Sequence, residues 1–127
     1  MSDAVVKTSR YSYSETIDRL TATIVAAGST VFANIDQSAA ARSAGMTLRP
    51  TTLIVFGNPK GGTPLMDAFP LAALELPLKL LIWEESGTVD VAYTPASVIA
   101  VRYAVAGKDA LIAALDHAVE TVVASVI

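Results

Sequence analysis

The chain has 127 residues, the length of a single domain, and 53% of them are hydrophobic while 17% are charged. This composition excludes an intrinsically disordered chain. The net charge of −3 argues against a nucleic-acid partner, and the absence of cysteine excludes disulfides and thiolate metal sites. We therefore expect one domain over residues 1–127, with no cofactor and no metal.

No segment is typical of a targeting signal or a membrane span. The first four residues lack a basic region followed by an apolar one. The longest apolar stretch, Pro70–Trp83, is interrupted by Glu75, Pro77 and Lys79, whereas a spanning helix needs about 20 nearly continuous apolar residues. We predict a soluble, cytoplasmic protein without a membrane partner. Export of a precursor that was later trimmed is the alternative.

The charge is distributed unevenly along the chain. Residues 1–63 carry six basic and four acidic side chains, a net charge of +2, and residues 64–127 carry three basic and eight acidic ones, a net charge of −5. The second half is therefore expected to present solvated acidic faces. The mildly positive first half favours an anionic ligand, and the two interpretations are compatible.

The hydrophobic pattern predicts alternating strands and helices. In chain order these are a strand over residues 5–11, a helix over 14–27, a strand over 30–36, a short helix over 37–44, a strand over 51–56, a loop over 57–62, a short helix over 65–69, a hairpin of strands 77–84 and 88–93, a short helix over 95–102 and a long helix over 108–126. Residues 71–76 are apolar and ambiguous between helix and strand.

Local signals set several of these boundaries. Ser12 and Glu15 have the spacing of a capping box at the start of the first helix, and Gly28 stands where that helix should end. In the loop over 57–62, Thr63 is expected to cap the following helix, with Pro64 as its first residue.

Side-chain alternation predicts which residues share a face of the sheet. Val31, Ala33 and Ile35 should lie on one side of their strand. The strand over 51–56 has almost no polar alternation, so we expect it to be central and buried.

Each long helix carries one apolar stripe, and one stripe requires one sheet face to cover. In the last helix the stripe consists of Leu111, Leu115, Val119, Val122 and Val126. The predicted fold class is α/β of the α+β type: a two-layer sandwich with a mainly antiparallel sheet of about five strands and two long helices on one face.

Two segments resemble a known family. The run Leu48–Met66, with Phe-Gly-Asn-Pro followed by Thr-Pro-Leu-Met, and the run Leu76–Glu84 are similar to conserved stretches of the family named domain of unknown function 302. The resemblance implies a two-layer α/β fold and small bacterial proteins, alone or as domains of exported proteins, without an assigned reaction. Glu75 stands where members often carry Asp, which keeps the carboxylate.

The segment from Gly57 to Thr63 is the best candidate binding site. A glycine-rich turn before a helix start has free backbone N–H groups that favour a phosphate or carboxylate. The candidate ligand-binding residues here are Asn58, Lys60, Gly61, Gly62 and Thr63. The segment matches neither the P-loop nor the dinucleotide-binding pattern. The alternative is a turn that Asn58 and Thr63 simply cap.

Three further residues complete the candidate ligand site: Asp36, Arg49 and Tyr93. Asp36 and Arg49 flank strands near the expected loop and are able to meet Asn58. The alternatives are that Asp36 caps the next helix and that Arg49 is a surface residue. Trp83 and Tyr93, on paired strands of the hairpin, are able to line a pocket or to serve as core or interface aromatics.

Catalysis has weak support in the sequence. His117, the one histidine, lies two positions after Leu115, about 200° around the helix, and so away from the apolar stripe. No nucleophile elbow occurs in the sequence. The first hypothesis is an accessory domain, a homodimer, that binds a small anionic or apolar ligand. The alternatives are an interaction module without a small-molecule site and an enzyme acting through Asp36, Lys60 or Tyr93.

Overall fold

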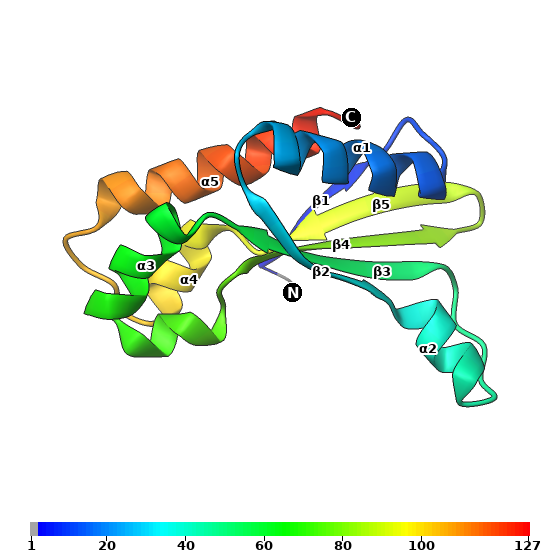
Figure 1. The fold of residues 1–127 in the computed structure, drawn as a ribbon, viewed down its shortest axis with the longest axis horizontal. Coiled ribbons are helices and arrows are strands. Elements are labelled where there is room, and N and C mark those ends of the chain that lie inside the picture. Colours follow the sequence, from blue (N-terminus) through cyan, green and yellow to red (C-terminus); the bar gives the residue numbers. More distant parts are fainter. Residues whose placement is uncertain (1–2) are drawn as a thin grey trace.

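The computed structural model describes residues 3–127 and contains one five-stranded antiparallel sheet in the order β1-β5-β4-β3-β2. The strands are β1 Val5–Thr8, β2 Thr30–Asp36, β3 Thr51–Gly57, β4 Leu78–Glu85 and β5 Thr88–Tyr93. Two long helices, α1 Tyr13–Ala26 and α5 Asp109–Ala124, lie over one face of this sheet (Figure 1). The predicted two-layer α+β architecture is confirmed. Met1 and Ser2, part of the segment examined for a targeting signal, lie outside the described residues.

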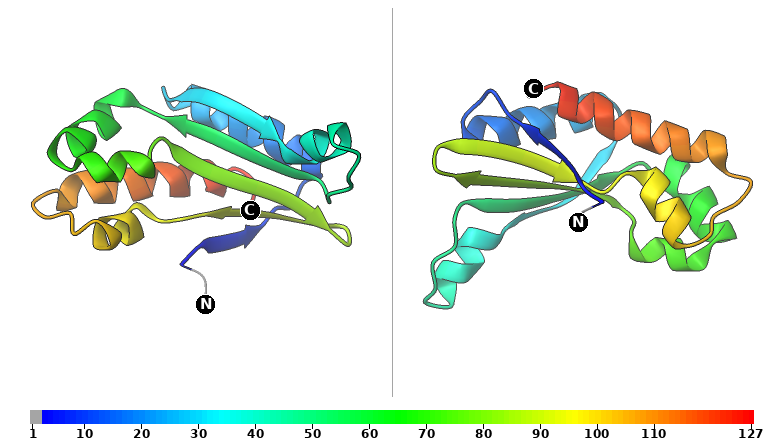
Figure 2. Two further views of the ribbon diagram at one scale, coloured as in Figure 1. Left: turned by 90° about the horizontal axis from the view of Figure 1, so that it is seen from below. Right: turned by 180° about the vertical axis from the view of Figure 1, so that it is seen from behind.

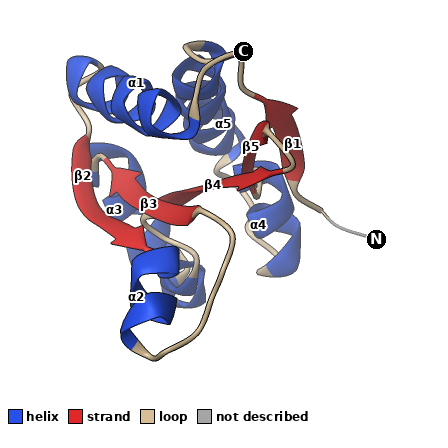
Figure 3. Ribbon diagram, turned by 90° about the vertical axis from the view of Figure 1, so that its right-hand side faces the viewer, coloured by secondary structure: helices blue, strands red, loops and turns tan. Residues whose placement is uncertain are grey.

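The core lies between the sheet and the two long helices. Alternate residues of the inner strands, such as Phe56 and Leu80, point toward the helices and are almost fully buried. Leu20 and Ile24 of α1 and Val119 of α5 pack against them from the helix layer. Separate helix and strand layers are visible when the sheet is viewed along its strands (Figure 3).

The first helix begins at the predicted cap. The Ser12 Oγ atom accepts a hydrogen bond of 3.2 Å from the backbone N–H of Glu15, and α1 ends before Gly28, which has φ +83°. Glu15 itself pairs with Arg19 one turn later rather than closing the second half of a capping box.

In the described part of the chain, the opposite face of the sheet carries no long helix (Figure 2, left). Four short elements stand at its two ends instead: α2 Gln37–Ser43 at one end, and α3 Pro59–Ala68, the 3₁₀ helix η1 Pro70–Leu74 and α4 Ala96–Arg102 at the other (Figure 1). The half-buried side chains of Leu53, Leu81 and Trp83 belong to this face, which we call the open face. Within residues 3–127, no helix has the length and apolar character needed to cross a membrane.

A bulge in β2 overturns the predicted sharing of a face by Val31, Ala33 and Ile35. Val31 pairs with Phe56 on the covered face, whereas Ala33 pairs with Val55 on the open face because the register shifts between them. Phe32 is the extra residue of the bulge, and 53% of its surface is exposed.

The strand over 51–56 is confirmed as an interior strand, but β4 rather than β3 is the central one. Only one side of β3 is fully buried, because its Leu53 and Val55 belong to the open face. The β4–β5 hairpin is confirmed, with the two-residue turn Ser86-Gly87 in positive φ.

Candidate functional site

The predicted glycine-rich loop is the first turn of a helix. The structure starts α3 at Pro59, four residues before Thr63, so the predicted cap at Thr63 is wrong. Asn58 is the actual cap, and its Oδ1 atom accepts a 3.0 Å hydrogen bond from the N–H of Lys60. An Asn cap followed by proline is a strong start signal, and it outweighs the low helix propensity of Gly61 and Gly62.

The backbone donors of this turn are already engaged. Pro59 has no N–H, Lys60 donates to the Asn58 side chain, and Gly61 and Gly62 both donate to the Asn58 carbonyl at 2.9 and 3.1 Å. In the structure, Asn58 therefore caps α3. Binding of an anion by the N–H groups of this turn stays a prediction. A cavity of 130 Å³ does form beside the turn; Asn58, Gly62 and Thr63 line it together with Phe32, Met66 and Leu76, while Lys60 and Gly61 do not.

Asp36 and Arg49 lie at the far end of the same strand pair from Asn58. Asp36 pairs with Thr52 near the start of β3, whereas Asn58 follows its last residue, roughly 20 Å away at 3.3 Å per residue. The structure therefore does not bring Asp36 and Arg49 to Asn58, and the alternatives of a helix cap and a surface residue apply. Asp36 caps α2 by accepting a hydrogen bond from the Ala39 N–H. The Ser38 hydroxyl, and after it the Ala39 N–H, hold the pKa of Asp36 below its ordinary value through their hydrogen bonds.

Arg49 and Trp83 have surface roles in the structure. Arg49 is exposed and lies 3.8 Å from Glu85, a separation at which a solvated ion pair contributes little. Trp83 pairs with Asp90 and lies on the open face. Tyr93 belongs to the covered face, so the two aromatic residues do not line one pocket. His117 is exposed on α5, as predicted.

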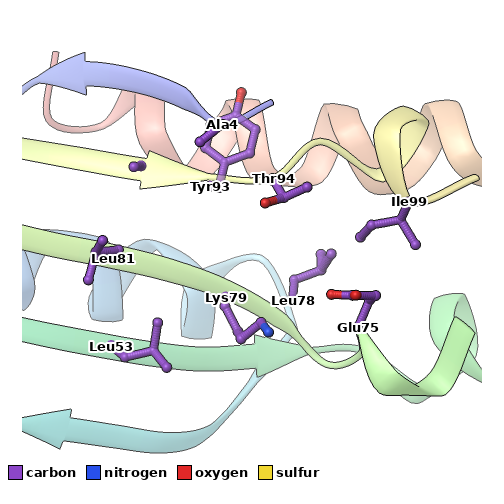
Figure 4. Close-up of a pocket in the computed structure, with 10 residues that line it drawn as sticks. Ala4, Leu53, Glu75, Leu78, Lys79, Leu81, Tyr93, Thr94 and Ile99 are labelled. Atoms are coloured by element: carbon purple, nitrogen blue, oxygen red, sulfur yellow. The ribbon is translucent and has the colours of Figure 1, made fainter. Parts of the chain in front are cut away.

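Another cavity, lined in part by the predicted residue Tyr93, lies at one end of the open face. It has a volume of 260 Å³ and lies where β4 and β5 meet η1 and α4 (Figure 4). We call it the β4–β5 pocket. Its lining residues are Ala4, Leu53, Glu75, Leu78, Lys79, Leu81, Ala92, Tyr93, Thr94 and Ile99. Most of them are apolar, which is the usual character of a small-molecule site.

Tyr93 contributes its position rather than its hydroxyl to this pocket. The hydroxyl points away from the cavity, toward α5 (Figure 4). Burial raises the pKa of Tyr93, and the carboxylates of Glu120 and Asp116 on α5 raise it further. A phenol that faces two carboxylates keeps its proton, so it does not supply a base to the pocket.

Glu75 is the most firmly held polar group of the pocket. Its Oε1 atom accepts hydrogen bonds of 2.9 Å from both the Tyr103 hydroxyl and Arg102 Nη1. The side chain is 19% exposed. The Tyr103 hydrogen bond, and after it the Arg102 guanidinium, hold the pKa of Glu75 below its ordinary value, although burial opposes them. Glu75 is therefore a fixed carboxylate at neutral pH.

Lys79 supplies the positive charge of the pocket. In Figure 4 its amine and the Glu75 carboxylate point toward one another. They do not form an ion pair within 4.0 Å, and in the part of the chain that the structure describes Lys79 has no other hydrogen bond or ion pair. Thr94 follows the last residue of β5 and lines the same pocket. The pocket therefore contains one ammonium group beside one anchored carboxylate, and the charge of Lys79 is a further, smaller cause of the lowered pKa of Glu75.

Sequence reasoning missed Glu75, Lys79 and Thr94 as site residues. Two of them left a signal, because Glu75 and Lys79 are charges that interrupt the longest apolar stretch of the chain. Their proximity to Thr94 and Ile99 depends on the β4–β5 register and on the packing of α4, which no local pattern reveals.

Comparisons with known proteins agree with the architecture just described. The chain belongs to the family described as "Domain of unknown function DUF302", whose model matches residues 5–122. A crystal structure of an uncharacterized conserved DUF302 protein from Bacillus stearothermophilus superposes with a TM-score of 0.90 over 100% of both chains at 16% sequence identity. At that identity, the likeness concerns the fold.

Curated relatives extend beyond this domain. Proteins named "Fluoride-specific ion channel FluC 1" from Brucella suis and Brucella abortus are 45% identical over 89 residues, 69% of this chain. The matched part is 35% of the first relative and 33% of the second, so the chain spans about a third of their length.

Proposed function

We propose that this domain is a non-catalytic accessory module that binds a small molecule in the β4–β5 pocket. The observation that carries the proposal is the pocket itself, a 260 Å³ cavity with mostly apolar walls, one carboxylate and one ammonium group. Ligand sites combine apolar walls with a few placed polar groups. The volume corresponds to roughly nine water molecules at about 30 Å³ each, which suits a metabolite-sized ligand.

The polar groups of the pocket suit recognition rather than bond chemistry. Thr94 is the hydroxyl residue at the rim, and a hydroxyl needs a neighbouring base to act as a nucleophile. Glu75 is already engaged by Tyr103 and Arg102, and its lowered pKa makes it a weak base. We propose binding for this reason.

An accessory role is supported by the lengths of the relatives. In the Brucella proteins the matching region is about a third of a longer chain with a fluoride-channel name. A module that is joined to other functional parts is suited to sense a ligand and to pass its binding on to a neighbour. We propose the same kind of role for this chain.

Native mass spectrometry of mildly purified protein tests the proposal. We expect a retained small molecule that is lost in the variant Leu81→Trp, whose ring would fill the pocket from its floor. Ile35→Trp is the matched control, because Ile35 lies on the same open face but outside the pocket and is 39% exposed. Retention that is equal in both variants would place the molecule elsewhere and contradict the proposal.

A second candidate function rests on the rest of the open face. Val6 and Ile35 on this face are 52% and 39% exposed, and Trp83 is only half-buried. Exposed apolar sheet faces mark interaction surfaces. We propose a second copy of the chain as the partner, since symmetric dimers are the commonest oligomers. Light scattering should then give a dimer that Ile35→Glu converts to a monomer; a monomeric parent protein would contradict this candidate.

A further inference from the structure

We propose that the ligand of the β4–β5 pocket is a small zwitterion with an apolar body, of the α-amino acid class. This inference rests on the proposed function, because it names the ligand of the same pocket. The structural basis is the arrangement of Lys79 and Glu75, two opposite charges that face one pocket without pairing with each other.

Lys79 is the partner for a ligand carboxylate. It stands on the open face of β4, opposite Val55 of β3, and lines the pocket together with Thr94. Among the described residues its ammonium group has no hydrogen bond or ion pair. A carboxylate at this point would gain a charge-assisted hydrogen bond, and the neighbouring Thr94 hydroxyl is an additional donor.

Glu75 is the partner for a ligand ammonium group. Both protein donors, Tyr103 and Arg102, bind its Oε1 atom, so Oε2 is left without a protein donor in residues 3–127. The two donors also fix the side-chain rotamer, which reduces the entropy lost when a ligand binds. The Glu75 side chain is 19% exposed, so a ligand can reach it. Its Oε2 atom is suited to accept a hydrogen bond from a ligand ammonium group.

A single charge on the ligand would suit this pair less well. A ligand with only a carboxylate would bring that group near Glu75, and a ligand with only an amine would bring it near Lys79. Both cases place like charges close together, which opposes binding. A zwitterion complements both groups at once.

The apolar walls define the remainder of the ligand. Leu53 and Leu81 form the floor from β3 and β4, and Ile99 closes the end from α4 (Figure 4). An aliphatic side chain would be removed from water there. The volume of 260 Å³ accommodates a molecule of the size of leucine.

Three probes that share one isobutyl body separate the charge contributions. L-leucine carries both charges, isocaproate only the carboxylate and isoamylamine only the ammonium group. In titrations followed by ¹⁵N–¹H NMR of the whole chain, we expect shifts around Thr94 and Ile99. L-leucine should bind about tenfold more tightly than either of the other probes, the loss typical of one charged hydrogen bond.

Two variants assign the charges to their residues. Glu75→Gln keeps an acceptor for Tyr103 and Arg102 but removes the charge. The affinity for L-leucine should therefore fall about tenfold, whereas the affinity for isocaproate should not fall. Lys79→Met should lower the affinity for L-leucine by a similar factor and leave the affinity for isoamylamine unchanged. Lys108→Met, a lysine outside the pocket, is the matched control and should change nothing.

The outcomes separate this inference from the proposed function. If isocaproate binds to the pocket as tightly as L-leucine, the zwitterion is excluded while a small-molecule site remains. If none of the three probes binds, the inference is overturned, and the proposed function fails only if native mass spectrometry also finds no ligand that Leu81→Trp displaces. Because Lys79 is exposed, Lys79→Met tests the inference even if Glu75→Gln does not fold.

Discussion

The Tyr103 hydroxyl donates a 2.9 Å hydrogen bond to Glu75 Oε1, although the two residues are 28 positions apart in the chain. The bond joins the residue after α4 to the residue after η1, and Arg102 adds a second bond to the same oxygen. These contacts hold two short elements together at one end of the sheet. A single carboxylate therefore links η1 to α4 at the wall of the β4–β5 pocket.

Removing the Tyr103 hydroxyl should lower the stability of the domain. In Tyr103→Phe, the carboxylate of Glu75 loses one of its two hydrogen-bond donors. A hydrogen bond to a charged group contributes roughly 1.5–3 kcal/mol. We expect a loss of about 1 kcal/mol in the free energy of unfolding, because Arg102 and water partly replace the donor. Urea unfolding followed by circular dichroism measures it.

Tyr11→Phe is the matched control for this change. The Tyr11 hydroxyl has no hydrogen bond among the described residues, and its ring contacts the Arg19 guanidinium at 3.8 Å, which phenylalanine preserves. An equal loss of stability in both variants would show that the Glu75 contact contributes nothing.

The Glu75 carboxylate should make the stability of the domain depend on pH. Its pKa in the folded state is below the ordinary value of 4.5, mainly because of the Tyr103 hydrogen bond. The stabilisation is therefore complete above the unfolded pKa and is lost as the pH falls through the folded pKa. The difference in free energy of unfolding between the parent and Glu75→Gln should be greatest at neutral pH and should shrink below pH 4.5.

Urea titrations of both proteins at neutral pH and at successively lower pH values measure this difference. A difference that stays constant from neutral to acidic pH would show that Glu75 has the same pKa in the folded and unfolded chains.

Asn58 should matter for the helix that follows it. Asn58→Ala removes the Oδ1 acceptor of the Lys60 N–H and should cost about 1 kcal/mol of unfolding free energy. Asn58→Asp should retain most of the stability, because aspartate caps equally well. Asn34→Ala is the control, since Asn34 is exposed on β2 without a side-chain hydrogen bond in the described part of the chain. A lower unfolding temperature for Asn34→Ala than for Asn58→Ala would contradict the capping role of Asn58.

Two glycines should respond in opposite directions to alanine. Gly61 lies inside α3, and a Cβ atom there would meet Leu115 at 3.5 Å, an ordinary contact. Gly61→Ala should therefore stabilise the domain by roughly 0.5–1 kcal/mol. Gly28 has φ +83°, so Gly28→Ala should destabilise it by about 1 kcal/mol through backbone strain. Thermal unfolding compares the two, and a loss of stability in Gly61→Ala would show that this glycine is needed for its lack of a side chain.

Much of the fold follows from patterns that are close together in the sequence. The Ser12 cap and the glycine at position 28 define α1, and the apolar stripe of α5 points to the sheet. The Ser86-Gly87 turn determines the hairpin. Each of these signals depends on interactions between residues a few positions apart, so each can be recognised from a short stretch of the sequence.

Two local predictions were wrong, one because neighbouring cap signals compete and one because a strand pairing is not visible in the strand itself. Asn58 and Thr63 are both good caps that precede a proline, and the structure uses the earlier one. In β2, strict alternation ignores the bulge at Phe32, which depends on how the strand pairs with β3.

Local sequence patterns were enough to predict the five strands, the two long helices, the two-layer fold and the family, but not η1 or the start of α3. The position of the pocket depends on the packing of distant segments, because Glu75, Lys79, Thr94 and Ile99 come from four separate elements or connections. The antiparallel pairing of β4 with β5 ends at Leu81 and Ala92, two residues from Lys79 and from Thr94. The contacts of Glu75 with Arg102 and Tyr103 connect η1 to α4. Such convergence results from packing between distant segments, and the free energy of that packing is not contained in any one segment.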